Sequence, residues 1–395
     1  MPLSRRHFCC IATSVAASRL LPAQELHPAG PTSRPDVAAI DHERILTAAG
    51  HYMALSPDPL TAHPTPGAPG TPNEFVSSLD EAPPELPAAE RRSEAFSAHR
   101  DALLNLCLAV GALTSAWVLT RTSDPAHAHG YAEHAARHLR AWFITPSTRM
   151  EPALDYAGVT SGTGGHPDGI VETSGLAEVA MAARFLLRAE TFSSEESTAL
   201  RAWFGAFLKW LTSSRLAGLA RDRKDHVGSS WLLQCAAYAR LSNDDGALAE
   251  LRHRFKSVTL RAEILGDGTF PHELNTLSPY RNSLFNLDLL AGACDLLSTR
   301  FDSLWEFQLQ DGPGLHVAVA RHAPFIESRG AWPYPADKRF FNDLPYRRPA
   351  LLFAARAYQR PEYATLWRSL NPDPKEPVLL RTFPIRQPLL WVTQV

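Results

Sequence analysis

Three polar segments carry the side chains that acid–base chemistry and anion binding require. They span residues 155–168, 221–231 and 266–282, and apolar stretches separate them. Imidazole, phenol and carboxyl groups can transfer protons, and guanidinium and amide groups can hold a carboxylate. All five groups occur in the third segment, as His272, Glu273, Tyr280, Arg281 and Asn282. We therefore expect loops between regular elements to form the functional site.

The second polar segment places His226 just before a predicted helix, whose N-cap we expect at Ser229 or Ser230. The positive end of a helix dipole favours a neutral imidazole, which could act as a base. Free N–H groups at such an end could also face an anion. A single histidine in this position is nevertheless more often an ordinary loop residue than a catalytic one.

Composition narrows the possible partners. The chain has 39 Lys and Arg against 41 Asp and Glu, a net charge of −2, which argues against nucleic-acid binding and against a polybasic membrane anchor. The Gly-rich first segment lacks the lysine of a phosphate loop, and no cluster of Cys and His suggests zinc. We therefore expect no cofactor and no metal, and the oligomeric state is left open. Cys107, Cys235 and Cys294 lie in apolar helical contexts, which favours buried free thiols.

Apolar residues recur with helical spacing over most of the chain, and sustained alternation typical of strands is absent. Ser193 and Glu196 form a capping box that predicts the start of one helix. The other predicted helices are residues 91–121, 131–143, 172–188, 230–241, 244–264, 283–299, 314–322, 345–359 and 362–369. Helices joined in pairs by loops indicate an all-α array of helical hairpins.

The N-terminal part divides into two sections. Residues 1–23 contain Arg5-Arg6 before a short apolar run, which predicts a twin-arginine signal peptide and a periplasmic or secreted protein. That run is too short to span a membrane, and we expect no later membrane span. Residues 24–90 are expected to hold a helix and a Pro-rich irregular segment, and residues 91–395 the main helical domain.

Several segments then follow one another in a specific order. They are residues 139–157, 169–173, 210–214, 224–226, 267–274, 284–288 and 332–334. In this order they resemble the alginate-lyase domain family of polysaccharide lyases, over about residues 125–360. The resemblance implies an incomplete (α/α) toroid with a substrate cleft across one mouth.

The resemblance places His226 at the histidine of the family's Asn-Asn-His motif. Asp225 stands where the family has an asparagine that helps to bind the uronate carboxylate. Asn282 occupies the position of the family's catalytic tyrosine, and Thr276 that of its arginine. Tyr280 and Arg281 lie close by in the sequence and could serve instead if the loop is rearranged.

The function implied is cleavage of a uronate-containing acidic polysaccharide by β-elimination. This reaction needs a neutralised C6 carboxylate, a base for the C5 proton and an acid for the departing O4. We assign His226 as the base or the carboxylate partner, Tyr280 as the base and acid, and Arg281 as the carboxylate clamp. The substrate-binding candidates are Asp225, Asn282, His272, Glu273, Tyr156 and Trp231.

Two other functions stay open at this stage. A glycoside hydrolase on the same toroid would use two carboxylates, such as Asp225 and Glu273, at a defined separation. A catalytically degenerate glycan-binding protein would fit the altered asparagine and tyrosine positions. Convergence of His226 and Tyr280 on one cleft would favour the lyase.

Overall fold

Helices make up nearly all of the regular structure in residues 32–65, 71–78, 96–159 and 164–394, which the computed structural model describes. The helices are α1 (Val37–Met53), α2 (Ala98–Thr120), α3 (Pro125–Leu139), α4 (Leu176–Leu186), α5 (Ser194–Ser213), α6 (Arg215–Arg221), α7 (His226–Ser242), α8 (Asp245–Arg254), α9 (Leu260–Glu263), α10 (Pro279–Leu297), α11 (Leu315–Glu327), α12 (Pro349–Tyr358), α13 (Pro361–Ser369), α14 (Pro377–Arg381) and α15 (Leu389–Val392). Thr32–Val395 forms one unit. The predicted signal peptide lies outside the described residues.

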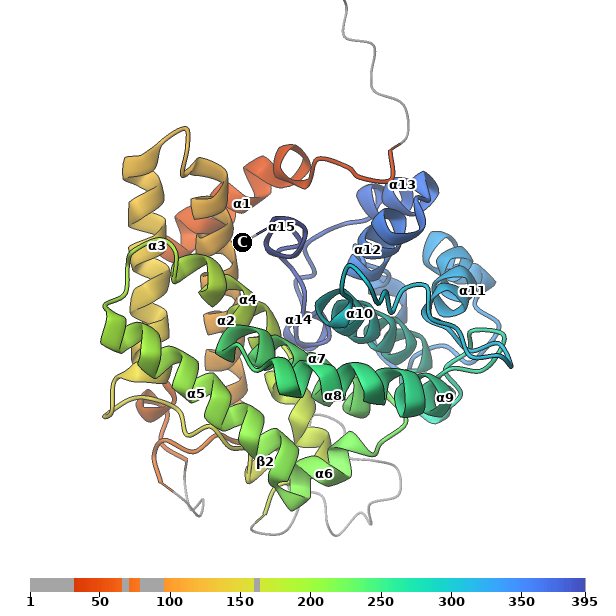
Figure 1. Ribbon diagram of the computed structural model, residues 1–395, viewed down its shortest axis with the longest axis horizontal. Coiled ribbons are helices and arrows are strands. Elements are labelled where there is room, and N and C mark those ends of the chain that lie inside the picture. Colours follow the sequence, from red (N-terminus) through yellow and green to blue (C-terminus); the bar gives the residue numbers. More distant parts are fainter. Residues whose placement is uncertain (1–31, 66–70, 79–95, 160–163, 395) are drawn as a thin grey trace, which may run out of the picture. The chain divides into compact units, whose positions relative to one another are not determined.

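Successive helices pack in antiparallel pairs around an incomplete ring (Figure 1). Helix α2 contacts α1, α3 and α4, helix α7 contacts α5 and α10, and α10 in turn contacts α12. Toward the C-terminus the chain returns to the inside of this ring, where α14 packs on α2 and α15 on both α2 and α4. The predicted (α/α) toroid is confirmed.

Helix α2 corrects one expectation from the sequence. Its 23 residues are long and apolar enough to cross a membrane, although we expected no such stretch. However, 67% of its most apolar window is buried inside the protein, against the helices that surround it. Its hydropathy is therefore that of a central core helix.

Side-chain caps mark the starts of six of the described helices, which are α1, α3, α5, α6, α7 and α8. The predicted capping box of α5 is present, because Ser193 and Glu196 each bond to the other's backbone N–H. Helix α7 differs from its prediction: it begins at His226 and is capped by Asp225, whose Oδ1 accepts the N–H of Val227 at 3.1 Å. Aspartate is as good an N-cap as serine, and this cap lies one helical turn earlier than the one we predicted.

Several elements were not predicted, among them the short helices α14 and α15 near the C-terminus. Strands β1 (Val76–Ser78) and β2 (Tyr156–Val159) form a short parallel pair that joins distant segments. Helix α6 was also missed; it has seven residues, and its N-cap is Ser214. The predicted buried free thiols, in contrast, are confirmed at Cys107, Cys235 and Cys294.

Candidate active site

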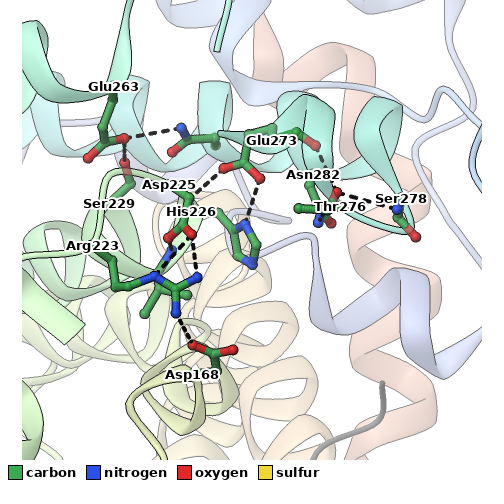
Figure 2. Close-up of polar contacts among 12 residues, drawn as sticks. Asp168, Arg223, Asp225, His226, Ser229, Glu263, Glu273, Thr276, Ser278 and Asn282 are labelled. Atoms are coloured by element: carbon green, nitrogen blue, oxygen red, sulfur yellow. Dashed lines mark hydrogen bonds and ion pairs between the residues drawn. The ribbon is translucent and has the colours of Figure 1, made fainter. Parts of the chain in front are cut away.

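The N-terminus of α7 organises the candidate site. Asp225, its cap, accepts two hydrogen bonds at Oδ2 from Arg223, at 2.5 and 3.2 Å. Arg223 also donates to Asp168 at 2.8 Å, so one guanidinium joins two carboxylates that are 57 residues apart in the sequence. Figure 2 shows this chain of ion pairs beside the ring of His226. The negative charge of Asp225 is therefore balanced within the protein.

His226 is held by one buried carboxylate. Glu273, which is 0% exposed, accepts the backbone N–H of His226 at Oε1 (2.6 Å) and pairs with its Nδ1 at Oε2 (2.9 Å). The side chain of His226 keeps 19% of its surface exposed. In Figure 2 its other nitrogen, Nε2, points away from Glu273. The carboxylate thus fixes the ring and leaves one nitrogen edge for a ligand.

The charge state of His226 differs from the prediction. Burial alone would lower the pKa of His226, but the carboxylates of Glu273, Asp225 and Asp168 outweigh it and raise the pKa to about 9. The expectation of a neutral imidazole at a helix N-terminus is therefore wrong for this histidine. At neutral pH it is an imidazolium, with Nε2 able to donate a hydrogen bond.

A second buried carboxyl group supports the same helix end from behind. Oε2 of Glu263, the last residue of α9, accepts hydrogen bonds from Ser229 at 2.6 Å and from Asn286 at 3.1 Å. Burial is the main cause that raises the pKa of Glu263 to about 8. These contacts tie α7, α9 and α10 together near the start of α7, and Figure 2 shows Glu263 bonded to Ser229.

Asn282 also belongs to this group. Its side-chain amide donates to Thr276 Oγ1 at 3.1 Å, and the Thr276 hydroxyl donates to the backbone carbonyl of Glu273 at 2.8 Å. Two positions where the family places its tyrosine and arginine are thus joined to the loop that holds His226.

Tyr280 and Arg281 lie in a different environment. The ring of Tyr280 is 0% exposed, and its hydroxyl donates to the carbonyl of Phe325 at 2.9 Å. Burial raises the pKa of Tyr280 well above the ordinary value of a tyrosine. Arg281 is buried, and its backbone N–H and that of Tyr280 both donate to Asp337. The structure therefore does not bring the Tyr280 hydroxyl to His226.

The remaining candidates take no part in the described hydrogen bonds between Glu273 and His226. Trp231 is buried, and its indole N–H donates to the carbonyl of Leu211 at 2.7 Å, which is a core contact. Tyr156 is half-buried in β2, and His272 is exposed. Sequence reasoning did not select Arg223, Asp168 or Glu263 for the site. Arg223 pairs with Asp168, and Glu263 with Ser229, across segments that are distant in the sequence. No local sequence motif predicts these contacts.

Within the described ranges, no three His, Cys, Asp or Glu side chains are grouped so that they could hold a metal ion.

Two solved structures are similar to this chain. An alginate lyase from Bacteroides ovatus has a similar structure, with a TM-score of 0.74, 21% sequence identity, and coverage of 88% of this chain and 94% of that chain. Alginate lyase A1-III from Sphingomonas species A1 is also similar, with a TM-score of 0.47, 14% identity, and coverage of 84% and 89%. A comparison with curated proteins gives no match.

The fold and the family match together define the class of this protein as a polysaccharide lyase on an (α/α) toroid. The model of the alginate lyase family matches residues 55–332. The chain belongs to the alginate lyase family.

Proposed function

We propose that this lyase cleaves a uronate-containing acidic polysaccharide by β-elimination, and that His226 neutralises the carboxylate of the sugar that is cleaved. The observation that carries the proposal is the buried Glu273 that holds His226 at Nδ1 and at the backbone N–H. An imidazolium held in this way presents Nε2 as a fixed cationic donor. Such a donor binds a carboxylate through a charge-assisted hydrogen bond.

The chemistry explains why a cation is needed there. The C5 proton of a uronate is weakly acidic because the neighbouring carboxylate already carries a negative charge. A positive donor at that carboxylate stabilises the additional charge that develops when the proton leaves. The raised pKa of His226 keeps the donor charged at neutral pH.

Proton transfer is the second requirement, and the sequence assigns it to Tyr280. In the described structure the hydroxyl of Tyr280 is bonded to the Phe325 carbonyl, and Arg281 is buried beside it. Either side chain must move before it can meet a substrate. Their assignment as base, acid and clamp stays a prediction, and Tyr280→Phe tests the part given to Tyr280.

The hydrolase alternative lacks support from the geometry. A glycoside hydrolase needs two carboxyl groups that face the scissile bond. Both oxygens of Glu273 are bonded to His226, and Asp225 caps α7 and pairs with Arg223. Neither carboxylate is presented for general acid or base work.

The decisive experiment is a screen of the purified chain on acidic polysaccharides, with the ultraviolet absorbance of unsaturated uronates as the readout. We expect absorbance to rise with at least one polyuronate and to stay flat with a neutral glycan. His226→Ala should reduce the rate by roughly a hundred- to ten-thousand-fold. A folded wild-type protein that binds polyuronates without producing unsaturated ends would identify a glycan-binding protein instead.

We also propose export through the twin-arginine route, on the basis of Arg5-Arg6 and the short apolar run after them. Replacement of both arginines by lysine should retain the precursor in the cytoplasm, which cell fractionation would detect. Export of that variant at the normal level would exclude this route.

A further inference from the structure

Three arginines from distant parts of the chain line one small cavity, which we call the three-arginine cavity. Arg44 lies on α1, Arg347 directly precedes the N-cap of α12, and Arg386 lies between α14 and α15. Asp41, also on α1, is the one acidic residue in its lining. The cavity has a volume of about 10 Å³, which suits a single water molecule or a single monatomic ion.

Each of the three arginines keeps one buried N–H group that bonds to nothing in the described part of the chain. These groups are Nε of Arg44, Nε of Arg347 and Nη1 of Arg386. A buried donor without an acceptor destabilises a protein, and more so when the donor is charged. An acceptor held in the cavity would meet this requirement for side chains of three separate segments.

Carboxylates balance only part of the positive charge around the cavity. Asp41, which is 2% exposed, accepts hydrogen bonds from Nη2 of Arg44 at 3.0 Å and from Nη1 of Arg347 at 2.7 Å. Asp373 pairs with Nη1 of Arg44 at 3.3 Å, but 61% of its side chain is exposed, so solvent screens its charge. Two guanidinium groups therefore share one buried carboxylate.

The third guanidinium, that of Arg386, faces the buried carboxyl group of Glu178. Oε2 of Glu178 accepts the backbone N–H groups of Arg386 and Gln387, both at 2.8 Å. Burial raises the pKa of Glu178 and lowers the pKa of Arg386, because the interior disfavours both charges. Burial likewise lowers the pKa of Arg347. A further anion beside these guanidinium groups would stabilise their charged forms.

A halide ion meets these requirements better than a water molecule does. A water molecule of this size adds no negative charge, and it must place its own two protons as well as accept hydrogen bonds. A halide has no protons to place, accepts N–H groups from several directions and carries one negative charge. Sulfate, phosphate and carboxylates are polyatomic and exceed a cavity of about 10 Å³.

From these observations we propose that the three-arginine cavity binds one chloride ion, and that this ion fastens α1 to the segments around α12 and α15. Arg44 already donates to the backbone carbonyl of Arg386 at 3.1 Å, so the ion would strengthen an existing junction between the N-terminal and C-terminal parts of the domain. The inference does not rest on the proposed function, and its test needs no substrate.

The test follows thermal unfolding of the wild type while chloride replaces gluconate at constant total salt. Gluconate has the same charge but is too large for the cavity. Because an ion that binds only the folded state stabilises it by mass action, Tm should rise by about 2 °C for each tenfold increase in chloride once the cavity begins to fill. A Tm that does not respond to this exchange would overturn the inference.

Arg386→Gln removes one of the three cationic donors, while Asp41 keeps its bonds to Arg44 and Arg347. Its Tm should lose most of the dependence on chloride. Arg140→Gln is the matched control, because Arg140 is a part-buried arginine that pairs with two carboxylates and does not line the cavity. It should keep the full dependence. Equal chloride effects in the wild type and both variants would overturn the inference.

Crystals of the wild type in sodium bromide give a second measurement that needs no variant. Bromide replaces chloride and is located by its anomalous scattering. We expect a peak in the three-arginine cavity, at hydrogen-bonding distance from the free N–H groups of Arg44, Arg347 and Arg386. Electron density there without an anomalous signal would identify a water molecule and would overturn the inference, even if the variants fail to fold.

Discussion

Glu273 holds His226 by two hydrogen bonds, one from the backbone N–H at 2.6 Å and one from Nδ1 at 2.9 Å, and has no exposed surface of its own. A buried carboxylate with a single cationic partner depends strongly on that partner, because an unpaired charge in the interior is costly. The same contact fixes the imidazole ring and its charge. The contact with Glu273 therefore determines both the position of the His226 ring and its protonation state.

The pH dependence of the wild-type enzyme follows from this pair. His226 has a pKa raised to about 9, so it is protonated below that pH and neutral above it. If the imidazolium binds the substrate carboxylate, kcat/KM is high at neutral pH and falls as the pH rises through about 9. Initial rates on a polyuronate between pH 6 and pH 10 would check this. A rate that instead rises through pH 9 would make neutral His226 the base.

Glu273→Gln should move that alkaline limb to lower pH. Glutamine keeps the size of the side chain but removes the largest of the three negative charges that raise the pKa of His226, so burial lowers this pKa further. Because Asp225 and Asp168 still raise this pKa in the variant, we expect the fall in kcat/KM to move from about pH 9 toward the ordinary histidine value, with a lower rate at alkaline pH than the wild type. Rate profiles and an NMR titration of His226 would measure both effects.

Glu178→Gln is the control for Glu273→Gln. Glu178 is also a buried glutamate that accepts two backbone N–H groups, from Arg386 and Gln387, but it lies on α4 and pairs with no histidine in the part of the chain that the structure describes. Its variant should change stability without moving the alkaline limb. A Glu273→Gln enzyme whose limb stays near pH 9 would contradict the role given to Glu273.

The helices could be predicted from the sequence because their signals are local. The capping box at Ser193 and the apolar stripes place α5, α10 and α12 near their observed positions. The start of α7 was misplaced, because Asp225, Ser229 and Ser230 are all acceptable caps in the sequence. Only the tertiary contacts decide among them: Ser229 is turned toward Glu263, which leaves Asp225 as the cap.

The site was harder to predict, because its key contacts join distant segments. His226 and Glu273 were both selected, but their direct pairing across 47 residues was not. The environment of Tyr280 depends on Asp337, which accepts the first free N–H groups of α10 from a loop far along the chain. No spacing rule within residues 266–282 contains that information.

Tyr280→Phe tests whether the buried hydroxyl takes part in catalysis. The hydroxyl donates to the carbonyl of Phe325, so its loss should cost about 1 kcal/mol of unfolding free energy. Because this contact occupies the hydroxyl, we expect kcat to stay within about threefold of the wild type, whereas a lost proton-transfer group costs about a hundredfold or more. Denaturant titration and steady-state rates would separate the two effects.

Tyr358→Phe provides the matched control for Tyr280→Phe, since the hydroxyl of Tyr358 donates to the carbonyl of Trp305 at 3.0 Å. Both variants should lose similar stability and keep their activity. If only Tyr280→Phe loses a hundredfold or more in kcat while remaining folded, Tyr280 leaves Phe325 during the reaction and transfers a proton as the sequence predicts.

Asp225→Asn restores the residue type that the family resemblance assigns to this position, and it separates the two tasks of Asp225. Asparagine is as good a helix cap as aspartate, so the bond to Val227 can persist and stability should change by no more than about 1 kcal/mol. Arg223 keeps Asp168 but loses one anionic partner, which makes the site more positive. We expect KM for a polyuronate to fall by roughly two- to tenfold.

Asp244→Asn makes the same change at the cap of α8 and should leave KM unaltered. A higher KM for Asp225→Asn, with normal stability, would mean that the ion pair between Asp225 and Arg223 positions the site. The negative charge of Asp225 would then not weaken substrate binding.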